Sequence, residues 1–539
     1  MPAVVASVLA TWLLAVPPPA AEPPVRKAPD RQLSFEAEAF GRQLIELAER
    51  VSTEYVQPVP AHELYLAGLA ELYDTAGLKF PEEIRKDILQ ANGYADSLRV
   101  ITNARVALGR RDELSGWRAF VIAVNGFSRA TDPYCALSWQ KSSSAAASDA
   151  DFGMGFELEG ATGGRWVAFQ LDSGPAAPIM TPNGTQPAEP PVGPKWIVKR
   201  VIPGSPAASA GLRPGDVVTH LNELEVTADS NARLFRRLAS FSNPDLADGQ
   251  TIDASKPVNL RVKREGALAP LDIAISRLGY NPESIFGVMK RADGAWNFML
   301  DRDAKIGYIR LGSVETPAAA TFALAMHSLA NEGATGLILD LRWCPGGYVD
   351  PTAGICGLLL KESVTIGTVK YRHPDRNFQS TFTAAAGQGV PTYESIPLAV
   401  LVGCDTIGGG EMIAAALQDH KRGIVVGQRT FGKANLMNIV NTSIPGLTYR
   451  ISTGYSFRPN GKARHRFPDS ALSDDWGVRP DRGYEFSTTP DYSAKMRLQA
   501  ERQAIRPPGD LGIVPFDDPL EDPQKLLAVK FLKEMIAKK

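Results

Sequence analysis

Three segments of the sequence combine glycines with charged side chains in a way that could support chemistry. Residues 340–347 end in a Gly-Gly pair, residues 408–410 are three glycines that precede Glu411, and Lys433 follows a short apolar run. Consecutive glycines before a helix leave backbone N–H groups accessible, and the helix N-terminus favours negative charge. A lysine acts as a base only when it is neutral, and burial lowers its pKa toward that state. Such segments could together stabilise an oxyanion and accept a proton.

The sequence lacks the signatures of several other catalytic classes. It contains no H-E-x-x-H, no G-x-S-x-G and no G-x-x-x-x-G-K-[ST] motif. Its four cysteines have no C-x-x-C spacing, so neither a zinc site nor a disulfide scaffold is expected; they are Cys135, Cys344, Cys356 and Cys404. The formal net charge of −1 gives no basic surface for nucleic acid. We therefore expect no metal, no cofactor and no nucleic-acid partner.

A chain of 539 residues exceeds one hydrophobic core and predicts roughly three or four domains. Apolar residues at helical spacing, such as Phe40, Leu44 and Val51, predict a helical N-terminal domain. From Lys305 onward apolar strands alternate with helices, which predicts an α/β core. The expected strands are 306–311, 336–341, 398–402 and 424–427, and the expected helices are 316–331 and 411–419.

Residues 203–218 resemble the signature of a PDZ domain. A small-residue helix is expected to end at Gly211, and Pro214-Gly215-Asp216 to turn into a strand at 217–221. Further strands are expected at 196–201, 258–263 and 271–275, and a second helix at 231–238. Ahead of them, Gly153, Met154, Gly155 and Phe156 form either an ordinary hairpin or a loop whose N–H groups capture a peptide carboxylate.

The N-terminus contains an apolar run, Val4–Val16, that suits a signal peptide but lacks a preceding Lys or Arg. If that signal is real, the protein is exported to a periplasmic or extracellular space; otherwise it is cytoplasmic. No later apolar stretch is long enough to span a membrane. The expected divisions are a signal and linker (1–33), a helical domain (34–149), a PDZ-like domain (150–280) with a Pro-rich insertion (163–194), an α/β core (281–485) and a C-terminal helical tail (486–539).

Several of these segments, taken together, resemble the C-terminal processing (tail-specific) peptidases. The matching segments, in chain order, are 55–56, 132–133, 203–218, 340–347, 406–411 with Gln418-Asp419, 431–434 and 477–481. The resemblance spans about residues 35 to 485. It implies a multidomain fold with a crotonase-like α/β peptidase core and cleavage near the C-termini of proteins. It also implies a serine nucleophile and a lysine base, without metal or cofactor.

The resemblance assigns roles to individual positions. Lys433, fourteen residues after Asp419, matches the lysine base, and Gly346, Gly347 and Gly409 match the backbone donors to the oxyanion. The position of the nucleophile, eleven residues before Asp419, is Gly408, which has no side chain and cannot form an acyl-enzyme. The family's glutamine, four residues after the lysine, is Met437 here. Of the three positions that the resemblance assigns to the nucleophile, the base and the glutamine, only Lys433 therefore keeps the family's residue.

Two functions remain open from the sequence. The chain is a C-terminal processing peptidase of impaired activity, or it is a non-catalytic scaffold that binds peptide C-termini. A substitute nucleophile could come from Cys344, Cys404 or Thr406. Simpler interpretations also exist, in which Lys433 is a solvated strand-end lysine and Glu411 is a helix cap or a partner of that lysine. Asp340 and Arg342 are expected to form a structural ion pair, and the oligomeric state is not fixed by the sequence.

Overall fold

The computed structural model describes residues 31–139, 151–153, 156–159, 196–222, 224–226, 257–276, 278–280, 283–291, 293–372, 379–387, 390–467, 470–504 and 520–538. The expected signal peptide, the Pro-rich insertion, the helix expected at 231–238 and the residues Met154 and Gly155 lie outside these ranges. None of the described helices is long and apolar enough to cross a lipid bilayer.

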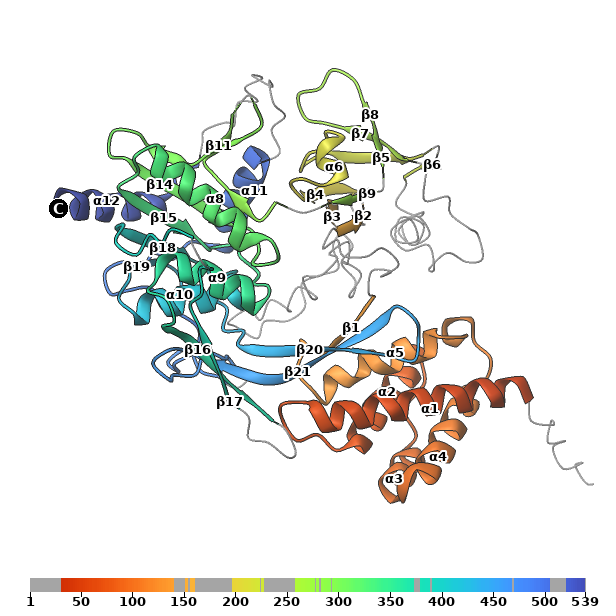
Figure 1. Cartoon of the computed structure of the whole chain (residues 1–539). Coiled ribbons are helices and arrows are strands. Elements are labelled where there is room, and N and C mark those ends of the chain that lie inside the picture. The colour runs from red at the N-terminus through yellow and green to blue at the C-terminus, as the bar shows by residue number, and fades with distance from the viewer. Residues whose placement is uncertain are drawn as a thin grey trace, which may run out of the picture.

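The N-terminal part is helical, as its apolar spacing predicts. Its helices are α1 (Arg31–Glu54), α2 (Ala61–Thr75), α3 (Glu82–Gln90), α4 (Gly93–Ala107) and α5 (Arg118–Gly126). Phe40, Leu44 and Val51 are buried on one side of α1, where they share a core with residues of α2, α4 and α5. This group lies at the lower right of Figure 1.

The PDZ-like part is a small antiparallel sheet at the upper right of Figure 1. Its strand order is β3-β4-β5-β7-β8, with bounds Phe156–Glu159, Ile197–Val201, Val217–Leu221, Val258–Lys263 and Leu271–Ile275; β6 (Leu224–Glu225) pairs with β5. The short helix α6 (Pro206–Ser209) begins at Ser205, whose side chain accepts the Ala208 N–H. Gly211 follows it with a φ of 84°, a conformation in which glycine commonly ends helices. The strands expected at 258–263 and 271–275 are confirmed.

The α/β core is built on a sheet with the order β10-β14-β15-β18-β19. The strands are Ile285–Phe286, Ile306–Leu311, Gly336–Asp340, Leu398–Val402 and Ile424–Gly427; the last four run parallel, whereas β10 and β13 (Met299–Asp301) pair antiparallel to β14. Every residue of β14, β15 and β18 is buried. Continuous apolar runs of this kind are typical of parallel strands covered on both faces.

Helices cover the two faces of this sheet (Figure 1). On one face, Leu337 and Leu339 of β15 join the core of α8 (Ala318–Asn331), α9 (Val349–Leu359) and α10 (Gly409–Asp419). On the other, Ile338 packs with Leu532 of α12 (Pro523–Ala537). The C-terminal helix, whose role the sequence did not indicate, therefore closes the second face of the core.

A second sheet, which the sequence analysis did not predict, joins the core to the N-terminal helices. Its order is β1-β21-β16-β17, with β20 also paired to β21; the bounds are Ala136–Trp139, Leu447–Phe457, Thr365–Tyr371, Gln379–Thr383 and Asn435–Asn441. The long strand β21 reaches from the core toward α5 (Figure 1). Its Tyr449 is fully buried against Phe127, with ring centres 6.1 Å apart. Lys433 lies just ahead of β20, so this sheet positions it.

Candidate active site

Gly408 lies in the turn between β18 and α10, immediately before the helix. Its φ of 54° and ψ of −110° form a backbone conformation that residues with side chains rarely adopt. A Cβ atom at this position would lie 3.7 Å from the Gly346 Cα and 3.9 Å from the Pro345 oxygen. A side chain at residue 408 is therefore opposed by backbone strain, whereas its Cβ would make only ordinary van der Waals contacts.

Glu411 connects this turn to the segment that carries Lys433. Its side chain is completely buried. The Oε2 atom accepts the N–H of Gly408 at 3.0 Å and the N–H of Lys433 at 2.9 Å. The Oε1 atom accepts the Thr430 hydroxyl at 2.6 Å and the Gly432 N–H at 2.7 Å. Glu411 is thus a helix cap that also holds the lysine segment through its backbone N–H groups.

Arg464 completes this arrangement, although nothing in the sequence pattern singled it out. Its Nη1 atom donates to the Gly408 carbonyl oxygen at 2.8 Å and lies 3.6 Å from Glu411 Oε2. Burial raises the pKa of Glu411, and the Arg464 charge and the hydrogen-bond donors around the carboxylate oppose that rise. Arg464 therefore stabilises the charged form of Glu411 and fixes the carbonyl group of the turn.

Lys433 is half-buried between the core and the N-terminal part of the chain. Its Nζ atom lies 4.8 Å from the centre of the Tyr134 ring. Burial lowers the pKa of Lys433 to about 8; the Arg450 charge lowers it further, whereas Asp132 opposes the shift. The neighbouring His465 has a pKa lowered to about 4, first by burial and then by Arg464 and Lys433. A neutral lysine is accessible close to physiological pH, which is what a proton acceptor requires.

The glycine loops at 346–347 and 408–409 pack directly against each other. A Cβ at Gly346 would lie 3.0 Å from the Gly409 nitrogen, and one at Gly409 would lie 3.6 Å from the Gly347 nitrogen. Both Gly346 and Gly347 have positive φ angles, 98° and 152°. Within the described ranges, the N–H groups of Gly347 and Gly409 have no acceptor, whereas the Gly346 N–H interacts with the Cys344 thiol. Two open donors therefore adjoin residue 408, as an oxyanion site requires.

An ion-pair network anchors the loop that carries these glycines. Arg342 Nη2 lies 2.6 Å from Asp340 and 2.8 Å from Asp522, the residue before α12. Farther along the loop, the Cys344 carbonyl oxygen accepts the Ile407 N–H at 2.9 Å. The expected structural pair of Asp340 and Arg342 is present, and it ties the loop to the C-terminal helix.

None of the three substitute nucleophiles is placed to act. Thr406 is completely buried; its hydroxyl donates to the Leu341 carbonyl oxygen at 2.8 Å and accepts the Gly403 N–H at 2.9 Å. Cys344 is also completely buried, which raises its pKa to about 12. Cys404 is exposed, and the pKa of its thiol is raised by partial desolvation and by Asp405. A thiol with a raised pKa contains little of the reactive thiolate.

Met437 and the loop between Gly153 and Phe156 are the remaining positions predicted from the sequence. Met437 lies on β20, opposite Ser452 and next to a register shift in the pairing with β21. Its thioether cannot donate a hydrogen bond to orient an amine. In the PDZ-like part, Gly153 ends β2 (Asp151–Gly153) and Phe156 begins β3 as a buried residue.

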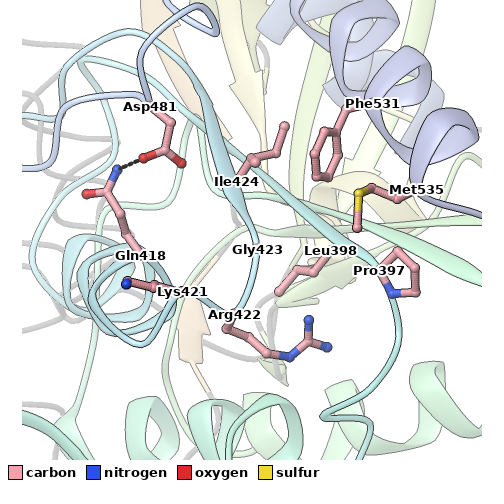
Figure 2. Close-up of a pocket in the computed structure, with 10 residues that line it drawn as sticks. All are labelled: Pro397, Leu398, Gln418, Lys421, Arg422, Gly423, Ile424, Asp481, Phe531 and Met535. Atoms are coloured by element: carbon pink, nitrogen blue, oxygen red, sulfur yellow. Dashed lines mark hydrogen bonds between the residues drawn. The ribbon is translucent and has the colours of Figure 1, made fainter. Parts of the chain in front are cut away.

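A pocket of about 350 Å³ opens on the core but contains none of the predicted site residues. It lies where Leu398 and Ile424 begin their strands, between the end of α10 and the α12 side chains Phe531 and Met535 (Figure 2). Gly408 and the 340–347 loop follow the carboxyl ends of the same parallel strands. The pocket is therefore at the opposite edge of the sheet from the candidate active site.

Comparison with known proteins identifies both folded modules. Residues 305–481 match the model of peptidase family S41, and residues 197–236 match that of the PDZ domain. The chain thus carries an S41 peptidase core together with a PDZ domain. These two matches, and relatives named as C-terminal processing proteases, support a C-terminal processing peptidase family with a PDZ domain.

Curated relatives agree with this assignment. A carboxyl-terminal-processing protease of Synechocystis is 29% identical over 45% of this chain and 50% of its own length. One of Bartonella bacilliformis is 24% identical over 62% of this chain and 72% of its own length. A C-terminal processing peptidase of Tetradesmus obliquus, named as chloroplastic, is 28% identical over 46% of this chain and 50% of its own length. The chain spans about half the length of the first and third of these relatives.

Among solved structures, a photosystem II D1 C-terminal processing protease is 18% identical, with a TM-score of 0.41 over 86% of this chain and 99% of its own.

Proposed function

We propose that this protein is a catalytically impaired C-terminal processing peptidase that binds the C-termini of proteins. The observation that carries the proposal is the glycine at residue 408, at the start of α10, where the family's motif has its serine. Peptide hydrolysis through an acyl-enzyme requires a nucleophilic side chain at that point. Loss of a main nucleophile typically reduces turnover by a factor on the order of 10⁶.

The other residues of the candidate active site support the binding of a peptide there. Open N–H groups at Gly347 and Gly409 can donate hydrogen bonds to a carbonyl or carboxylate oxygen of a bound chain. Lys433 is charged below about pH 8 and neutral above it. The two N–H groups and Lys433 can hold a peptide next to Gly408. A side chain at residue 408 that could attack the peptide is missing. We infer that peptide C-termini first bind the PDZ domain and then enter this cleft.

A second candidate function is slow hydrolysis by water. It is favoured by the lowered pKa of Lys433, because a neutral amine beside two oxyanion donors could deprotonate a water molecule in place of a serine. This route predicts turnover that does not form a covalent intermediate and that disappears in Lys433→Ala.

We also propose that the protein is exported. The apolar run at Val4–Val16 supports this location. The chloroplastic name of one relative is also consistent with proteins of this family acting outside the compartment in which they are made.

One experiment separates these functions. The purified full chain is incubated with an unfolded protein that has an apolar C-terminus, and the products are analysed by mass spectrometry. We expect no cleavage by the wild type but saturable binding of peptides with a free apolar C-terminus. Amidation of that terminus should weaken binding by about ten-fold or more, because a carboxylate held by backbone N–H groups is lost. Efficient cleavage would refute impairment, and equal affinity for the amidated peptide would refute carboxylate capture.

A further inference from the structure

Arg310 is a buried cation that has no ion-pair partner among the described residues. It lies on β14 opposite Asp340 of β15 and is only 6% exposed. In the part of the chain that the structure describes, its guanidinium makes no hydrogen bond or ion pair. Its contacts are instead aromatic: the guanidinium carbon lies 4.2 Å from the centre of the Phe286 ring and 5.9 Å from that of Trp343. A buried charge without a counter-charge is strongly disfavoured, so such a group calls for an anion.

A cavity of about 190 Å³ lies directly against this guanidinium. It is bordered by the sheet, by the β11–β12 hairpin (Met289–Lys290 and Trp296–Asn297), by α11 (Pro490–Ala504) and by the start of α12. Its lining includes Trp296, Tyr308, Arg310, Trp343, Gln499 and Lys525. At about 30 Å³ for each water-sized group, the space holds about six such groups. This size fits a small ligand and excludes a folded peptide.

The other charges around the cavity neutralise one another. Asp340 and Asp522 both pair with Arg342, at 2.6 and 2.8 Å, and Lys525 lies 3.5 Å from Asp522. These two acids and two bases have no net charge. On α11, Arg497 pairs with Glu501 at 3.1 Å. Among the described residues, Arg310 is therefore the positive charge at this space that no ion pair neutralises; burial lowers its pKa, and Asp340 and Glu501 oppose that shift only from a distance.

We propose that this cavity binds a small oxyanion, a carboxylate or a phosphate, through the guanidinium of Arg310. A guanidinium presents a planar set of donors that matches two oxygens of such an anion. The amide of Gln499 adds a further polar group, and the rings of Trp296 and Trp343 supply apolar walls. Trp343 belongs to the loop that carries Gly346 and Gly347, so the anion site adjoins that loop, but Gly408 is not among its lining residues.

Calorimetry on the full chain tests the proposal. Sodium phosphate and sodium malonate are titrated separately, with sodium chloride used to hold the ionic strength constant. We expect saturable binding of one anion per chain. Binding of phosphate alone identifies a phosphate site, binding of malonate alone identifies a carboxylate site, and binding of both shows that the cavity accepts either group. The absence of saturable binding by both anions would overturn the proposal.

Variants at Arg310 locate the site. Arg310→Gln should weaken binding by about ten-fold or more, because the charge-assisted pair is lost. Arg302→Gln is the matched control, since Arg302 is exposed on the turn before β14; its affinity should equal that of the wild type. If Arg310→Gln does not fold, Arg310→Lys serves in its place: it keeps the charge but loses the planar fork, so its binding should also be weaker. Unchanged affinity in the folded Arg310 variant would place the anion elsewhere and overturn the proposal.

Discussion

Gly408 and Lys433 donate their backbone N–H groups to the same atom, Glu411 Oε2, at 3.0 and 2.9 Å. The positions that the resemblance assigns to the nucleophile and the base are thus fixed to each other through one buried carboxylate, although twenty-four residues separate them along the chain. This connection uses only backbone groups at both ends. It therefore does not depend on a side chain at residue 408.

Replacing Glu411 should destabilise the fold strongly. Glu411→Ala removes the acceptor for four donors and leaves Arg464 without its buried counter-charge. We expect a loss of about 3–5 kcal/mol in the free energy of unfolding, measured by chemical denaturation. Glu362→Ala, at an exposed position, is the control and should change it by less than about 0.5 kcal/mol. A similar, small effect for both variants would show that Glu411 does not hold the two segments together.

The sequence predicts the core strands well because burial on both faces leaves a clear pattern. Leu398–Val402 and Ile424–Gly427 are continuous apolar runs, Ile306–Leu311 is apolar except for Arg310, and all three form strands at the expected residues. The sheet of β1, β16, β17, β20 and β21 has no such signal. Its strand β21 pairs with β1 about 310 residues earlier, and a pairing across that separation is set by tertiary contacts that local patterns do not encode.

Some residues of the candidate site are likewise predictable from the sequence, and others are not. Gly408, Lys433 and the glycines at 346–347 are identified by motif spacing, since their roles depend on residue type and order. Arg464 could not be identified, because its partner is the carbonyl oxygen of Gly408, and every residue has a carbonyl group. The same holds for Arg310, whose burial and missing partner depend on the packing of α11 and α12.

The C-terminal helix should be essential for stability of the core. Leu532 is completely buried against the sheet face that carries Ile338, whereas Leu526 on the same helix is 52% exposed. Leu532→Ala should reduce the free energy of unfolding by about 2–5 kcal/mol. Leu526→Ala is the matched control and should cost less than about 1 kcal/mol. Equal effects in denaturant titrations would contradict the packing of α12 on the sheet.

The half-buried Lys433 should make the free energy of unfolding depend on pH in a defined window. Its pKa falls from 10.5 to about 8 on folding, so the unfolded chain binds more protons between these values and stability rises with pH there. Below pH 8 the folded state carries the full cost of a buried ammonium. Lys433→Met should therefore be more stable than the wild type by up to about 3 kcal/mol below pH 8.

That difference should shrink as the pH rises through 8 and vanish near 10.5. Denaturant titrations at a series of pH values measure it. Lys361→Met, at an exposed position, is the control and should leave the pH profile of the wild type unchanged. A stability difference for Lys433→Met that is constant from pH 6 to pH 10.5 would show that the amine is not buried in the folded state.

Restoring the side chain at residue 408 should restore peptidase chemistry. In Gly408→Ser the Cβ has room, since its nearest neighbours lie 3.7 Å or more away, and the strained backbone should cost about 1–2 kcal/mol. The serine would then adjoin the open N–H groups of Gly347 and Gly409, in the turn that Glu411 links to the Lys433 backbone. Weak cleavage of an unfolded protein and labelling by a fluorophosphonate probe are expected, and adding Met437→Gln should increase both by orienting the lysine.

Two controls make this result specific to the site. Gly461→Ser places a serine on another glycine with positive φ, 80°, in a turn with no neighbours within 4 Å; it should fold with similar strain but neither cleave nor label. Adding Lys433→Ala to Gly408→Ser should reduce the rate by about 10²–10⁴, the usual contribution of a general base. The rate of labelling should also rise with pH through about 8, as the Lys433 ammonium loses its proton. If the folded double variant with Met437→Gln neither cleaves nor labels at pH 9, the cleft no longer has peptidase geometry and peptide binding is its remaining function.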